Sequence, residues 1–197
     1  MISDTLKPIV KTNKAIITSQ YALYKNAGPY LLPNDFNEIP QNLQIKILYR
    51  RFFRLRPFVS TKEMIQSSYT NYIRNKFREN YALKRKIALG IDEPPSIDKD
   101  INSGVKTLAF VTKAVSLVDT KNNNGILEDN AICHKLLKNI LSVEYHRSVQ
   151  FKLPREYQIL RISYEYLNSN FKRLEYKSLR NNDISIIQLN ELLGTRL

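Results

Sequence analysis

The fold is decided by the stretch Ile45-Lys46-Ile47-Leu48-Tyr49-Arg50-Arg51-Phe52-Phe53-Arg54-Leu55-Arg56-Pro57-Phe58. Four apolar residues in it follow at intervals of three, four and three, which places them on one face of an α-helix: Ile45, Leu48, Phe52 and Leu55. Basic residues recur every four positions on the opposite face: Lys46, Arg50 and Arg54. We therefore predict an amphipathic helix that begins near Gln41 and stops or bends at Pro57.

A second helix is predicted to follow, and to pack against the first as an antiparallel hairpin. Ser60-Thr61-Lys62-Glu63 has the pattern of a capping box, in which the Ser60 hydroxyl accepts from the main-chain N–H of Glu63. Gly90 supplies a stop, so we expect this helix to reach about Leu89. Its apolar residues broadly share one face: Ile65, Tyr69, Tyr72, Ile73, Leu83 and Ile87. Its arginines share another: Arg74, Arg78 and Arg85.

The whole chain is predicted to be all-α, because it has only five glycines and long runs without glycine or proline. Residues 1–40 are predicted to form an extended or irregular N-terminal arm, punctuated by prolines, and 91–103 an acidic, proline-containing linker. Residues 104–197 are predicted to be a C-terminal helical region that forms one compact domain with the hairpin. Asp183 is expected to cap its last helix.

Positive charge is concentrated in residues 41–90. This segment holds twelve Lys or Arg and two acidic residues, whereas the rest of the chain carries only +3 of the total of +13. A strongly basic segment attracts polyanions, which include acidic proteins, nucleic acids and anionic lipid surfaces. The charge therefore predicts a docking surface on the hairpin without choosing its partner.

Leu48-Tyr49-Arg50, the proline that follows and Ile73-Arg74-Asn75-Lys76-Phe77-Arg78 together resemble the Leu-Tyr-Arg motif proteins of mitochondria. The resemblance covers about residues 43–89. It implies a helical hairpin whose basic face meets the acidic helices of acyl carrier protein and whose apolar interior receives an acyl chain. The long C-terminal half departs from that compact pattern, and its helices could fill the interior. The partner-binding residues implied are Leu48, Tyr49, Arg50, Arg51, Arg54, Arg74, Phe77 and Arg78.

A second resemblance spans both ends of the chain. The stretches that carry it are Lys14 to Thr18, Tyr49 to Phe58, Asn80 to Arg85, Leu137 to Asn139 and Leu189 to Leu197. They resemble a small fungal family named for increased recombination centers and also described as required for respiratory growth. The likeness implies a location in mitochondria, in the matrix, and a role in mitochondrial DNA maintenance, genome integrity, respiratory growth and sporulation.

Two other interpretations of the basic face remain open. The arginines could form a solvated face of a basic protein, or they could neutralise the phosphates of mitochondrial DNA or RNA. The phenylalanines near them fit the apolar spacing of helices, which favours a place in the core over base stacking: Phe52, Phe53, Phe58 and Phe77.

The sequence offers no pattern that is typical of an enzyme. It contains no phosphate-binding glycine loop, nucleophile elbow or metal-binding cluster, so we expect a non-catalytic protein without a cofactor or metal. Cys133 and His134 are adjacent in a predicted helix and point about 100° apart, which disfavours a shared site. A single cysteine fits a reducing compartment, and no window approaches the length of a membrane span. The first twenty residues do not have the pattern of a cleavable secretory signal, and they support a mitochondrial presequence only weakly.

Overall fold

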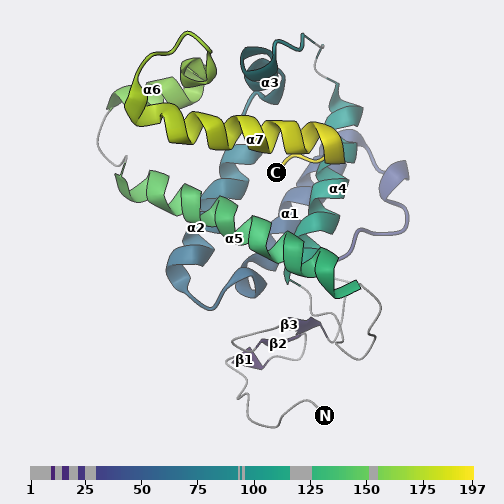
Figure 1. Ribbon diagram of the computed structural model, residues 1–197. Coiled ribbons are helices and arrows are strands. Elements are labelled where there is room, and N and C mark those ends of the chain that lie inside the picture. The colour runs from purple at the N-terminus through teal and green to yellow at the C-terminus, as the bar shows by residue number, and fades with distance from the viewer. Residues whose placement is uncertain are drawn as a thin grey trace.

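The structure is a computed structural model, and it describes residues 10–11, 15–17, 22–24, 30–92, 94, 96–115, 126–150 and 155–197. Seven α-helices make up most of this described part (Figure 1). They are α1 (Gln41–Val59), α2 (Glu63–Lys76), α3 (Tyr81–Leu89), α4 (Ile97–Val115), α5 (Ile126–Gln150), α6 (Arg155–Ser163) and α7 (Lys177–Leu193). Three 3-10 turns accompany them: η1 (Phe36–Glu38), η2 (Glu165–Leu167) and η3 (Leu174–Tyr176). The predicted all-α class is confirmed.

A small antiparallel sheet lies in the segment for which we predict an irregular arm. Its strands are β1 (Val10–Lys11), β2 (Ala15–Ile17) and β3 (Ala22–Tyr24), in the order β1-β2-β3. The central strand coincides with the short β-branched run of the N-terminal sequence, where β-branched side chains favour extended backbone. Within the predicted extended or irregular arm, these three short segments are therefore extended strands.

The main core lies where α1, α2, α4 and α5 pack together. Helix α1 packs against α2 and α4, and α5 packs against the same two helices. Three of the four residues in the predicted apolar stripe of α1 are buried in this core: Leu48, Phe52 and Leu55. Ile45 is 37% exposed, so the stripe is shorter than predicted.

Helices α1 and α2 pack against each other, but their ends differ from the prediction. Pro57 lies inside α1, which continues to Val59. The Ser60 hydroxyl accepts from the main-chain N–H of Lys62 at 3.1 Å, and no side-chain cap forms at the start of α2, so the expected capping box is absent there.

The predicted second helix is divided into α2 and α3. Asn80 separates the two, and its side chain accepts from the main-chain N–H of Leu83 at 3.1 Å, which caps α3. Gly90 then ends α3 in a left-handed conformation, as predicted. Helix α4 begins at Ile97, inside the stretch predicted as a linker.

A second, smaller apolar cluster joins α7 to the turns before it. Its buried members are Tyr164, Tyr166, Leu167 and Ile187. Helix α7 begins at Lys177, so Asp183 lies in its interior and not at its start. The predicted cap is wrong, and Asp183 is instead a buried side chain.

Residues 194–197, which we call the C-terminal segment, fold back onto the helices. Gly194 ends α7 with a φ of +63°, a conformation that glycine adopts without strain. The side chain of Asn190 then holds Leu197 by two bonds, since its Oδ1 accepts from the Leu197 N–H at 2.7 Å and its Nδ2 donates to the Leu197 main-chain oxygen at 2.9 Å. Lys76 of α2 donates to that oxygen as well, at 2.8 Å. Leu197 is thereby fully buried.

Candidate functional site

The basic face predicted for the hairpin lies on the surface. Arg50 and Arg54 are exposed on α1, and Arg74 and Arg78 are exposed at the end of α2 and just beyond it. In the described part of the chain, no carboxylate forms an ion pair with Arg50, Arg74 or Arg78. Arg51 is only partly exposed, and its pKa is lowered by burial and by the neighbouring charge of Arg54.

The aromatic residues of the predicted site hold the two helices together. The rings of Tyr49 and Phe77 meet edge to face, with centroids 5.2 Å apart, and Phe77 also contacts Phe52 at 6.0 Å. Phe77 keeps 38% of its surface exposed. Tyr69 of α2 adds a buried hydrogen bond from its hydroxyl to the main-chain oxygen of Phe52, at 2.9 Å. These contacts bring Tyr49 and Phe52 of α1 next to Phe77, the residue that follows α2.

The apolar side of the hairpin is covered by α4. Leu48 is 3% exposed, and its Cδ1 lies so near Gly104 that a Cβ on that glycine would approach it to 3.1 Å. A side chain at position 104 would press on Leu48 at this distance between α4 and α1. The space beside Leu48 is thus filled by the protein's own helix.

Charged residues that our sequence analysis does not predict are also buried, between α5 and α7. Arg147 donates to Asp183 at 2.6 Å, and the hydroxyl of Tyr166 donates to the other carboxylate oxygen of Asp183. Burial alone would raise the pKa of Asp183, but Arg147, Lys84 and the two hydrogen bonds lower it to about 2. Asp183 is therefore ionised and fully paired.

A second buried carboxylate lies beside the first, on α5. Both oxygens of Glu144 accept from Arg161 of α6, at 2.8 and 3.1 Å, and one of them also accepts from Asn75 at 3.3 Å. The pair ties α6 and α2 to α5.

The third buried carboxylate, Glu79, lies in the turn between α2 and α3. Lys76 and Lys84 approach its two oxygens at 3.1 and 3.2 Å. Burial opposes ionisation of Glu79, but the two ammonium groups outweigh it and lower its pKa.

These three carboxylates surround a cavity of about 360 Å³, which we call the interhelix cavity. It is lined by side chains of α2, α3, α5, α6 and α7 and by the turns next to them. The hydroxyl of Tyr72 is buried at its wall and has no hydrogen-bond partner among the described residues. Arg78 is the one member of the predicted basic face that also lines the cavity.

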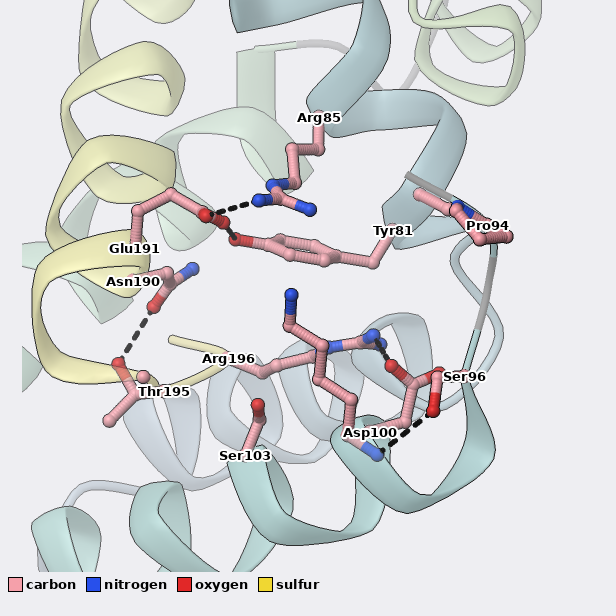
Figure 2. A pocket seen from close by; sticks show the side chains of 13 residues that line it. Tyr81, Arg85, Pro94, Ser96, Asp100, Ser103, Asn190, Glu191, Thr195 and Arg196 are labelled. Carbon is pink, nitrogen blue, oxygen red and sulfur yellow. Dashed lines mark hydrogen bonds and ion pairs between the residues drawn. The ribbon is translucent and has the colours of Figure 1, made fainter. Parts of the chain in front are cut away.

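A smaller pocket of about 160 Å³ lies beside the C-terminal segment (Figure 2). The guanidinium of Arg196 lies over the ring of Tyr81, 4.4 Å from its centroid, and forms an ion pair with Asp100. Arg85 is paired with Glu191 at 2.7 Å. Burial, the largest cause, raises the pKa of Tyr81 to about 12. The polar groups that line this pocket are thus largely paired with one another, which is typical of a structural contact.

No group of His, Cys, Asp and Glu in the described residues could hold a metal ion. His134 is exposed and places Nδ1 3.0 Å from the main-chain oxygen of Ala114, and the adjacent Cys133 packs against the main core. No helix in the ranges that the structure describes has the length and apolar character to cross a membrane.

Comparison with known proteins identifies the family. Residues 10–197 match the family model described as Increased recombination centres protein 19. The chain belongs to this family. The Increased recombination centers protein 19 of Eremothecium gossypii is 52% identical over 192 residues, which cover 96% of this chain and 90% of the relative. The protein of that name from Vanderwaltozyma polyspora is 40% identical, over 95% of this chain and 96% of the relative.

More distant members of the Increased recombination centres protein 19 family also match almost from end to end. The protein from Saccharomyces cerevisiae strain S288c is 33% identical, over 95% of this chain and 97% of the relative. No solved structure matches the chain. The predicted resemblance to this fungal family is confirmed, and two of the stretches that carry it, 80–85 and 189–197, meet at the pocket of Figure 2.

The sequence analysis does not predict the buried charges of α5 and α7, because charged residues are ordinarily exposed. A signal was present in α7, where Asp183, Ile187 and Asn190 follow at intervals of four and three and are all buried. Polar residues at the apolar spacing of a helix indicate an internal hydrogen-bonding network.

Proposed function

We propose that this protein is a non-enzymatic helical adaptor that docks an acidic partner through the exposed arginines of α1 and α2. The observation that carries the proposal is the surface formed by Arg50, Arg74 and Arg78, which lack ion pairs in the part of the chain that the structure describes. Guanidinium groups that are already exposed lose little hydration when they bind a carboxylate or phosphate, and their planar shape suits both.

Acyl carrier protein is the partner that the Leu-Tyr-Arg resemblance favours, because its helices are acidic and it carries a phosphate. Tyr49 and Phe77 lie beside the arginines and would supply an apolar contact at the same surface. The proposed docking does not include an acyl chain beside Leu48, since α4 already fills that space.

The biological role that we propose is support of mitochondrial DNA maintenance and respiratory growth, and through these of genome integrity and sporulation, in the mitochondrial matrix. The name of the relatives refers to recombination centers, and this supports a role in genome maintenance for the chain. An adaptor that assembles other proteins needs no active site of its own.

The test is affinity purification from mitochondria of the wild-type chain and of the double variant Arg50→Ala, Arg74→Ala. We expect the double variant to fold normally and to lose its acidic partner, because exposed helical arginines contribute little to stability. The control variant Lys113→Ala, Lys135→Ala removes the same charge from exposed positions on α4 and α5 and should keep the partner. Equal recovery of the partner by both variants, or absence of acyl carrier protein from the wild-type sample, would contradict the carrier-docking proposal.

A second candidate function is direct binding to mitochondrial DNA or RNA, which the concentration of twelve basic residues in 41–90 favours. Binding to phosphates releases counterions, so the affinity for a DNA duplex should fall steeply as salt is raised. A fluorescence titration at several salt concentrations checks this. An affinity for DNA that does not change with salt would exclude this function.

A further inference from the structure

We propose that the interhelix cavity binds a small oxyanion, a molecule that carries a phosphate or carboxylate group. Its volume of about 360 Å³ is within the range of small-molecule sites. The cavity is distinct from the docking surface of α1 and shares only Arg78 with the surface proposed above.

The charges around the cavity leave a positive excess. Its lining includes five basic residues and three carboxylates: Lys76, Arg78, Lys84, Arg147 and Arg161, with Glu79, Glu144 and Asp183. Two positive charges therefore have no counterpart among the lining residues. An anion would complete the balance, and in a partly buried site its attraction to these groups is screened less than at the surface.

The hydrogen-bonding groups of the lining point to the same class of ligand. The oxygens of Asp183 are taken by Arg147 and Tyr166, and those of Glu144 by Arg161. Lys76 also donates to the main-chain oxygen of Leu197, but each of the two ammonium groups at Glu79 has three hydrogens, so donors remain after every carboxylate is paired. Such a site lacks a carboxylate for a metal cation and suits a ligand rich in acceptors.

Tyr72 supplies the specific donor. Its hydroxyl is buried at the cavity wall without a partner in the described part of the chain, which is costly for a polar group unless a ligand or water completes it. Burial, and then the charge of Glu79, raises the pKa of Tyr72. The hydroxyl therefore stays protonated at neutral pH, and its proton needs a hydrogen-bond acceptor. An anion oxygen in the cavity meets that requirement.

The experiment measures thermal unfolding of the full chain while inorganic phosphate or citrate is added at constant ionic strength, with chloride as the reference. We expect the Tm to rise and to saturate with at least one of the two anions, because a ligand that binds only the folded protein stabilises it by mass action. A rise with phosphate alone, or with citrate alone, assigns the oxyanion class. No saturable rise with either anion would overturn the proposal.

Two variants locate the binding. Tyr72→Phe keeps the ring and removes the donor, so the unliganded Tm should stay or rise while the affinity for the anion falls about tenfold, as expected for one hydrogen bond to a charged group. Arg161→Gln should also weaken binding, whereas the matched exposed variant Arg74→Gln should not. An equal loss with Arg161→Gln and Arg74→Gln would mean general attraction to a basic protein and would refute the cavity.

Anion binding in the interhelix cavity can be tested separately from docking of the acidic partner. Arg50→Ala with Arg74→Ala leaves the cavity intact and should leave the anion response unchanged, while Tyr72→Phe should still capture the protein partner. Loss of both functions in both variants would refute the independence of the cavity.

Discussion

The ionisation of Asp183 contributes to the stability of the fold. Its pKa is about 2 in the folded protein, whereas the ordinary value for an aspartate is 3.8, so the folded state favours the ionised form. The stabilisation is complete above pH 4 and is lost as the pH falls from about 4 to about 2. A shift of this size corresponds to roughly 2 kcal/mol.

We predict that the free energy of unfolding falls as the pH is lowered through this range. Urea unfolding at pH 6, 4 and 3 measures the change. Asp183→Asn should be less stable than the wild type at pH 6 by about 3 kcal/mol, because it leaves Arg147 buried without its partner. The variant should also lose less stability between pH 6 and 3. Some pH dependence will remain, since the pKa of Glu79 is lowered as well. Parallel curves for the two proteins would contradict this role of Asp183.

The exposed and buried charges differ in how far they could be predicted. The exposed arginines of α1 follow directly from the spacing of the apolar stripe, since a residue opposite a buried face is on the surface. The pairing of Arg147 with Asp183 depends on how α5 and α7 meet, which the spacing of residues within one helix does not contain. The network around the interhelix cavity was therefore found only in the structure.

At the scale of the helices, the contact of Leu48 with Gly104 sets the distance between α1 and α4. We predict that Gly104→Ala does not stabilise the protein, although alanine favours a helix by about 1 kcal/mol over glycine. The added methyl group would press on Leu48, which is buried and has little room to move.

The same substitution should act in the opposite direction once Leu48 is shortened. In a Leu48→Ala background, Gly104→Ala should raise the free energy of unfolding by about 1 kcal/mol, because the space is open and only the helix preference remains. Chemical unfolding of the four proteins of this cycle measures the difference. Equal effects of Gly104→Ala in the two backgrounds would show that the helices do not meet as described.

The helix boundaries show where local patterns are insufficient. Pro57 was expected to stop or bend the first helix, yet α1 continues for two residues beyond it. Asn80 lies within the range predicted as one second helix, but its side chain caps a new helix. The start of α3 thus depends on a local side-chain cap, which the apolar pattern alone does not contain.

At the scale of the whole molecule, the C-terminal segment joins four helices. Leu197 bonds to α2 and α7, and Arg196 lies against α3 and α4. The main-chain N–H of Arg196 also donates to Thr107 of α4 at 2.7 Å. The segment therefore couples elements that are distant in the sequence.

We predict that Leu197→Ala lowers the free energy of unfolding by about 2–4 kcal/mol, as expected for a fully buried leucine. Hydrogen exchange should increase in α7 and at the end of α2, which the segment holds together. Leu192→Ala is the matched control, because Leu192 is 84% exposed on α7 and its removal should change stability by less than about 0.5 kcal/mol. A similar small effect of both variants would show that the segment does not hold the helices.

The meeting of Arg85 with Glu191, and of Tyr81 with Arg196, also has an evolutionary consequence. Residues that touch across more than a hundred positions of sequence should change together as the family diverges. A relative that replaces Arg85 by an acidic residue should carry a basic residue at the position of Glu191. A relative without the aromatic ring of Tyr81 should have lost the cationic residue at the position of Arg196. Covariation between these two stretches would then record the contact in the history of the fungi that carry the protein.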